Sequence, residues 1–286
     1  MKHYYLFFAA ICIFTINTSA QTSSGKILLT KGQKIQIDNN VKTVSSQEMA
    51  GQAIEITVNA DMTHQLEVKA RKKNSYVLSS TLTKLATNGS AMGQEMKFDS
   101  EKKEDLESET GKALKDQLNV TKELELDENS KVINGVKKDT ATTPGSGQLM
   151  DIMNNITGGG GDESNGASAA FDVIPAGKKA GDSWSDSSVT EEMKIYRNYT
   201  IKAINGSDAT VTLTGKQITK KKIEMQGMEI NVSMEGTLSG EGVVDIKTGL
   251  VKQKTTVLDG ISSTEVMGQS IPGTTKITTT TTVKTI

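Results

Sequence analysis

Apolar and polar residues alternate most regularly between Met228 and Ile246. The even positions of this segment are apolar or glycine, and the odd positions are nearly all polar. Because successive side chains of a strand point to opposite faces of a sheet, the pattern predicts one half-buried strand. It is longer than the usual strand of about 3–10 residues.

Turn residues on both sides of this segment predict its neighbours. Gln226-Gly227 predicts a two-residue hairpin turn, which places Met225 opposite Met228 and Leu213 opposite Gly240. Lys247-Thr248-Gly249 predicts a second turn. It leads into a strand at Leu250–Leu258, and a last strand is expected over residues 275–286, with Ile277 and Val283 on one side.

The N-terminal half has a similar strand-like sequence pattern. Strands are expected at Gln52–Ala60, Met62–Ala70, Ser75–Ala86 and Met92–Phe98. The segment that starts at Leu66 resembles the segment that starts at Tyr199, 133 residues later. Similar turn requirements in threonine-rich strands and an internal duplication both explain this likeness.

Three glycines, Gly236, Gly240 and Gly242, lie on the apolar side of the long strand. A glycine inside a strand costs about 0.5–1 kcal/mol relative to alanine, so strong bending or close approach of another group is expected there. The predicted fold is mainly β, with long curved antiparallel sheets that form a half-barrel or a sandwich, and an arrangement as two related halves stays open. One or two short helices are expected at residues 106–118 and Ser146–Thr157, and the second would fill the concave side.

The N-terminus resembles a secretory leader. Lys2 is followed by an apolar run from Tyr4 to Ile16, and Thr18-Ser19-Ala20 supplies small residues for cleavage before Gln21. A buried N-terminal strand or helix is the alternative. The predicted organisation is a signal peptide (1–20), an N-terminal β-rich half (21–138), a linker with a short helix and a glycine-rich loop (139–170) and a C-terminal β-rich half (171–286).

The composition of the chain argues against several kinds of function. Cys12, the only cysteine, would leave with the leader, so disulfides and thiol chemistry are not expected in the mature chain. A net charge of -1 and 4% aromatic residues argue against nucleic-acid binding. No later segment has the length of a transmembrane helix. We expect an exported protein, periplasmic or extracellular, with a peripheral position at the outer membrane left open.

No catalytic, cofactor-binding or metal-binding residue is predicted. His64 lies on the polar side of its expected strand and is expected at the surface. The sequence contains no nucleophile elbow, zinc-protease, Walker or dinucleotide motif. Its acidic loops lack the spacing of an EF-hand.

The segment FDVIPAGKKAGDSW (Phe171–Trp184), with LDENSKV, GVVDIKTGLV and MGQSIP elsewhere, resembles an uncharacterised family of secreted β-rich proteins from Bacteroidota-type bacteria, classed as a domain of unknown function. The resemblance implies secretion and a β-rich fold, and it supplies no catalytic residues. The glycine-rich stretch after Ile156 departs from the family.

Three functions therefore remain open. The first is a non-enzymatic envelope protein with a structural or protein-binding role. The second is a carrier or sensor of an apolar ligand, such as a lipid or a lipoprotein acyl chain, and the third is a hydrolase. For the second, the candidate ligand-binding residues are Met228, Ile230, Met234, Leu238 and Trp184. A core anchor is the alternative role for Trp184. No cofactor is expected, and the expected partners are envelope proteins or a lipid.

Overall fold

The computed structural model describes residues 23–49, 52–91, 94–114, 117–135, 166–225, 228–266 and 268–286. The N-terminal elements are β1 (Lys34–Met49), β2 (Gln52–Arg71), β3 (Ser75–Ala91), β4 (Gln94–Asp99), α1 (Lys103–Glu107), α2 (Glu109–Leu114), β5 (Thr121–Asp127) and β6 (Val132–Asn134). The C-terminal elements are the 3-10 helix η1 (Ala167–Ala170), β7 (Ser183–Val189), β8 (Met193–Asn205), β9 (Asp208–Met225), β10 (Met228–Asp245), β11 (Val251–Val266) and β12 (Gln269–Thr285).

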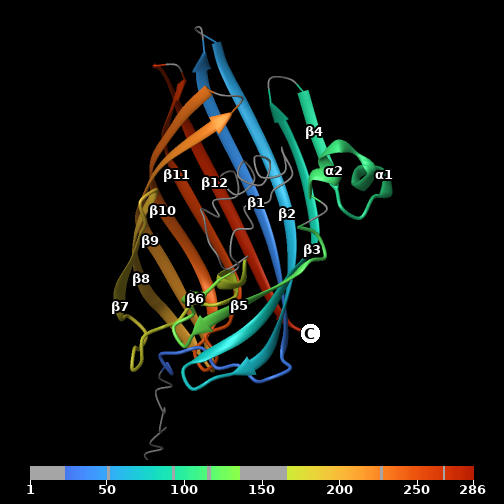
Figure 1. Ribbon diagram of the computed structural model, residues 1–286. Coiled ribbons are helices and arrows are strands. Elements are labelled where there is room, and N and C mark those ends of the chain that lie inside the picture. The colour runs from blue at the N-terminus through green and yellow to red at the C-terminus, as the bar shows by residue number, and fades with distance from the viewer. Residues whose placement is uncertain are drawn as a thin grey trace, which may run out of the picture.

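All of these strands belong to one antiparallel sheet of 12 strands. Its order is β6-β5-β3-β2-β1-β12-β11-β10-β9-β8-β7, and β4 pairs with the upper part of β3. The first and last strands, β1 and β12, pair in the middle, so the N-terminal strands lie on one side and the C-terminal strands on the other (Figure 1). The sheet curves strongly, and β6 and β7 are its two ends in the described part of the chain. This confirms the predicted mainly β fold with long curved antiparallel strands, and the described strands form one open sheet instead of a sandwich of two.

The predicted register of the long hairpin is confirmed. Met225 pairs with Met228, and Leu213 pairs with Gly240. Ile277 is buried and Val283 is partly buried on the same face of β12. The segments predicted as Gln52–Ala60 and Met62–Ala70 form the single strand β2, and β1 was not predicted at all.

The predicted helix near residues 106–118 is present as two short pieces, α1 and α2, which lie beside β4 (Figure 1). Gly111 lets them pack together, because a Cβ atom there would clash with the carbonyl oxygens of Asp105 and Leu106. The other predicted helix, Ser146–Thr157, lies outside the described residues.

The lower end of the concave side holds the main core. Two apolar clusters meet there, one built on β1, β2, β3 and β5 and the other on β8 to β11. Ile27 and Leu29, which precede β1, and Ala167 and Ala170 of η1 fill the first cluster from inside. Side chains from segments outside the strands therefore fill the lower end of the concave side.

The inner-face glycines mark places where neighbouring backbones approach closely. A Cβ atom on Gly240 would lie 2.6 Å from the carbonyl oxygen of Thr255 in β11, and one on Gly236 would lie 2.9 Å from that of Asp259. We expected Leu213 to be the group that packs across Gly240. The backbone of β11 makes the limiting contact instead, so the glycines serve close strand approach on the concave face of a bent sheet.

Two hairpins share an irregularity that bears on the proposed duplication. The β2–β3 register shifts between Val68 and Ala70, and the β8–β9 register shifts between Ile201 and Ala203, 133 residues later. A shared bulge is a more specific likeness than shared composition, because bulges are positional features of a strand pair. The duplication and the division into halves at residues 138 and 171 stay predictions.

Replacing Gly240 tests this account of the bend. We expect Gly240→Val to lower the free energy of unfolding by about 1–3 kcal/mol, because the new side chain overpacks against β11. Ser239→Val, on the exposed face, is the matched control and should change it by less than about 0.5 kcal/mol. Chemical denaturation of both variants measures the difference. Equal stabilities would show that Gly240 is not needed for strand approach.

Candidate ligand-binding face

Above the lower core, the concave side of the sheet presents a second set of apolar side chains. Val41, Leu258 and Ile277 are buried there, and Met62, Met234 and Leu238 pack against them. Ile56, Met193 and Ile195 are half-buried and lie on the same face by strand register. We call these nine residues the upper concave face. They come from β1, β2, β8, β10, β11 and β12, so the face spans both halves of the chain.

The structure brings together part of the predicted ligand-binding set. Met234 and Leu238 lie on the upper concave face, with Gly236 between them on the same side of β10. Ile230 is half-buried further up the same strand. Met228 pairs with Met225 at the tip of the hairpin, where no side chain is described. Trp184 lies elsewhere. It stacks on Tyr199 with ring centroids 5.0 Å apart and packs against the lower core.

A polar belt lies between the upper concave face and the lower core on β1, β12 and β11, and on β2 Met62 continues the same row. Asn39, Thr281 and Lys254 are neighbours in one cross-strand row, and the Thr281 hydroxyl donates to Asn39 Oδ1 at 2.7 Å. Lys254 Nζ lies 2.8 Å from Asp172 Oδ2, and the two side chains are only 23% and 27% exposed. These four residues are the polar belt. Because its groups satisfy one another, it can lie between two apolar regions without a large desolvation penalty.

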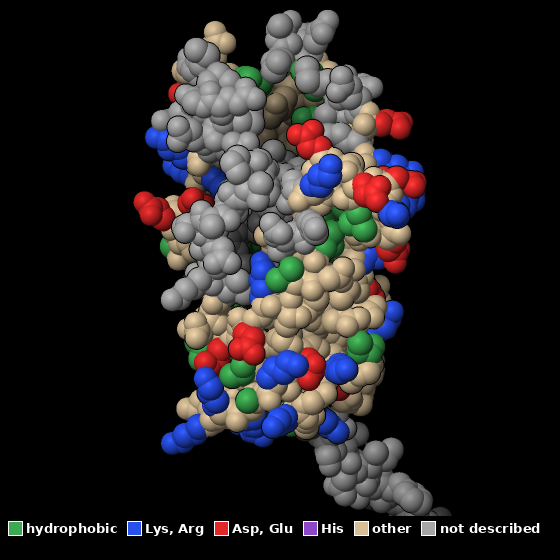
Figure 2. All heavy atoms as spheres, turned by 45° about the vertical axis from the view of Figure 1, so that its right-hand side comes forward, with side chains coloured by type: hydrophobic (Ala, Val, Ile, Leu, Met, Phe, Trp, Pro, Cys, Tyr) green, Lys and Arg blue, Asp and Glu red, His purple; other side chains and the backbone are tan. Residues whose placement is uncertain are grey.

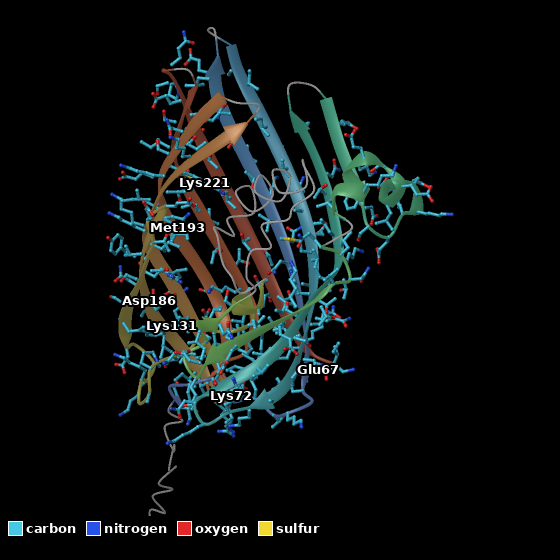
Figure 3. All side chains as sticks on the ribbon, viewed as in Figure 1. Glu67, Lys72, Lys131, Asp186, Met193 and Lys221 are labelled. Atoms are coloured by element: carbon cyan, nitrogen blue, oxygen red, sulfur yellow. The ribbon has the colours of Figure 1, made fainter. Side chains whose placement is uncertain are left out.

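The ionisable side chains in and around the polar belt carry no net charge at neutral pH. Burial, and next the nearby carboxylate of Asp172, raise the pKa of the Tyr199 hydroxyl above its usual range. Tyr199 therefore stays protonated at neutral pH. Arg197 Nε lies 3.1 Å from Asp186 Oδ1 where β8 meets the edge strand β7. Figure 3 labels Asp186 and Met193 on this side of the sheet.

His64 is not at the surface, and that prediction was wrong. Its side chain is 7% exposed and points to the concave side, in the same row as Ile37. The β2–β3 register shifts between Thr63 and His64. Burial lowers the pKa of the imidazole to about 4, and among the residues that the structure describes its Nδ1 has no hydrogen-bond partner. His64 shares the inner side of β2 with Met62 and Leu66, so regular alternation along this strand does place it inward.

Two pockets of the described structure are small or lined by polar residues. A cavity of about 10 Å³ between Tyr199, Leu213, Gly242 and Lys254 is about the size that holds one water molecule. A shallow pocket of about 330 Å³ lies along β7 and β8 and is lined by Ser185, Asp186, Ser187, Tyr196, Arg197 and Asn198. Neither is lined by methionine and isoleucine.

In the described part of the chain, neither the charged side chains nor the helices indicate another functional site. Lysine, arginine and acidic side chains are interspersed over the face shown in Figure 2. Within the described ranges, no three His, Cys, Asp or Glu side chains come close enough to hold a metal ion. None of the helices seen there is long and apolar enough to cross a membrane.

Comparison with protein families identifies the family to which the chain belongs. The model of a family of unknown function, DUF6263, matches residues 73–251, from the β2–β3 turn to the first residue of β11. The chain belongs to the DUF6263 family. The predicted membership of an uncharacterised family is therefore confirmed, whereas the bacterial group and secretion stay predictions. No curated protein matches the sequence.

Solved structures similar to this DUF6263 protein are distant. One describes lipid–protein interactions in lipovitellin; it is 8% identical, and the match covers 90% of this chain and 25% of that chain with a TM-score of 0.46. Another is an outer membrane channel from Pseudomonas putida F1; it is 9% identical, and the match covers 91% and 98% of the two chains with a TM-score of 0.25. The DUF6263 chain thus spans about a quarter of the lipovitellin chain.

Burial of His64 predicts a pH dependence of stability. Well above pH 6.5 the imidazole is neutral in the folded and unfolded states and has no effect on stability. As the pH falls from 6.5 towards 4, the unfolded chain binds a proton that the folded chain does not. The free energy of unfolding should then fall, by about 2 kcal/mol between pH 7 and pH 5.

Denaturant titrations at pH 7 and pH 5 measure this loss. The variant His64→Leu removes the titrating group, so its loss should be smaller than that of the wild type by about 2 kcal/mol. The comparison cancels the contribution of the carboxylates, which both proteins share. An equal loss in both proteins would refute the assignment to His64.

Proposed function

We propose that this DUF6263 protein is an exported, non-enzymatic binding protein of the cell envelope. In this proposal the upper concave face holds an apolar ligand, such as the acyl chain of a lipid or of a lipoprotein. The observation that carries the proposal is the continuous row of Leu238, Leu258 and Ile277 with half-buried Met62 and Met234 around it, above a satisfied polar belt. A sheet that needed only a core would not require an apolar face above that belt.

The energetics suit a flexible apolar ligand. Burial of one methylene group contributes about 0.8 kcal/mol, so eight methylenes laid along this face would contribute about 6 kcal/mol before the cost of association. Met193 and Met234 are half-buried at the upper edge of the face. Methionine side chains are unbranched and polarizable, and they adapt to irregular apolar partners. The face therefore suits a class of acyl chains rather than one rigid molecule.

A structural or protein-binding role is the second candidate, and the edge strand β7 favours it. β7 pairs with β8 on one side and, within the described part of the chain, ends the sheet on the other. Val189, at its end, is 59% exposed, and Tyr196 of β8 is 46% exposed. An exposed edge with apolar side chains can pair with a strand of another protein. A hydrolase is the third alternative, and it would need a cleft with converging carboxylates.

Export is part of the proposal and has its own test. The leader pattern in residues 1–20 lies outside the described part of the chain, so the sequence alone supports it. We expect N-terminal sequencing of the protein purified from its own host to begin at Gln21. A chain that still begins at Met1 would contradict export by this leader.

Ligand binding is tested with a paired substitution on β10. Met234→Glu places a charge on the upper concave face, whereas Ser233→Glu places the same charge one position away on the exposed face. Titration with a fluorescent long-chain fatty acid should give a dissociation constant at least tenfold weaker for Met234→Glu. The Ser233→Glu protein should bind like the wild type.

Two results would count against the proposal. Absence of saturable binding to the wild type would remove the carrier function, and equal weakening by both substitutions would place the ligand elsewhere. Native mass spectrometry of protein from its own host adds an independent observation, because a retained lipid would appear as a fixed mass increment.

A further inference from the structure

Arg197 stands in the same cross-strand row as the three central apolar residues of the upper concave face. The row runs over five neighbouring strands, from β8 to β12, as Arg197, Gly215, Leu238, Leu258 and Ile277. Each step joins two residues that lie directly opposite each other, so all five positions share one side of the sheet. The apolar row therefore has a permanent positive charge near the β7 edge of the sheet.

The register of β7 and β8 places the guanidinium on the concave side. Arg197 lies two positions before Tyr199 on β8, and Tyr199 is buried in the lower core on that side. The pairing of β7 with β8 is regular here, with Trp184 opposite Tyr199 and Asp186 opposite Arg197. Because side chains two positions apart on a strand share a face, Arg197 and Asp186 lie on the same side as the two stacked rings.

Gly215 leaves a strip of bare backbone between Arg197 and the apolar row. A Cβ atom at Gly215 would clash with the carbonyl oxygen of Tyr196, so the close approach of β8 and β9 excludes a side chain there. The distance from Arg197 to Leu238 is two strand spacings, roughly 10 Å. A cation on one side and an apolar side chain on the other thus border a strip that can receive the first atoms of a ligand.

Arg197 is bound by its acid less completely than the other cation near this face. Lys254 Nζ donates to both carboxylate oxygens of Asp172, at 3.0 and 2.8 Å. Arg197 Nε lies 3.1 Å from Asp186 Oδ1, yet this buried Nε makes no aligned hydrogen bond within the described part of the chain. The Arg197 side chain is 28% exposed. A guanidinium has five N–H donors, so it can bind a second carboxylate as well as Asp186.

We propose that Arg197 binds the head group of the ligand, and that the ligand is a single acyl chain ending in a free carboxylate. The inference rests on the proposed function and narrows it from acyl chains in general to fatty acids. The carboxylate lies over Gly215 and accepts from the Arg197 guanidinium, and the chain follows the row towards Ile277. An esterified or amidated chain lacks the charge that Arg197 binds.

The row also sets the length of chain that it can hold. The four strand spacings from β8 to β12 amount to at most about 19 Å on a concave surface. An extended chain advances about 1.2 Å per bond, so roughly 16 carbons reach from Arg197 to Ile277. In a series of fatty acids, each methylene should tighten binding about fourfold up to that length and add little beyond it. Steady tightening well beyond it would contradict this path.

Calorimetric titration with dodecanoate and with dodecanol separates the head group from the chain, because the two molecules differ only in the head. We expect the wild type to bind the acid at least tenfold more tightly than the alcohol. Arg197→Gln should abolish that preference by weakening the acid alone. Asp186→Asn removes a competing negative charge, so it should tighten the acid about threefold and leave the alcohol unchanged.

Lys194→Gln is the matched control, since it removes the same charge from the exposed side of β8 and should bind both molecules like the wild type. If Arg197→Gln does not fold, the gain in Asp186→Asn carries the test, because a folding defect does not tighten binding. Equal binding of acid and alcohol by the wild type, or an equal loss in Lys194→Gln, would overturn the role of Arg197 and leave the proposed function standing. Absence of binding of both molecules would remove the proposed function, and this inference with it.

Discussion

Close approach of neighbouring backbones at the inner-face glycines is the constraint on which the rest of the structure depends. Gly236, Gly240 and Gly260 lie where β10 and β11 leave no room for a Cβ atom. Each glycine costs about 0.5–1 kcal/mol of conformational entropy, and the fold accepts that cost where strands bend around the concave side. A sheet without these positions would be flatter, and its two ends would not curve over a shared interior.

The curvature creates an interior with two levels. Below, segments outside the strands fill the space, with Ile27 and Leu29 from one side and Ala167, Ala170 and Phe171 from the other. Above the polar belt, the sheet presents apolar side chains from both halves of the chain. The belt keeps the levels distinct because Lys254 and Asp172 neutralise each other at their boundary.

Much of the fold could be predicted from period-two alternation and turn residues, and the rest could not for physical reasons. The β9–β10 register followed from one turn and one face. β1 was not predicted because its inner positions include Asn39, Thr43 and Gln47, which weaken the alternation of apolar and polar residues. His64 was assigned to the surface because of its polar side chain, although it alternates with the inner residues Met62 and Leu66 of β2. Met234 and Leu238 were found because strand period orders them, whereas Trp184 joined another cluster through tertiary packing.

The central claim is that the upper concave face is an apolar binding surface, and methyl NMR tests it most directly. Methyl resonances of Met193, Met234 and Ile195 report on this face, and Ile261, which is 68% exposed on the opposite face, reports on the outside. With a spin-labelled fatty acid, the account predicts saturable broadening of the three concave resonances and none at Ile261. Broadening at Ile261 alone, or equal broadening at all four, would contradict it.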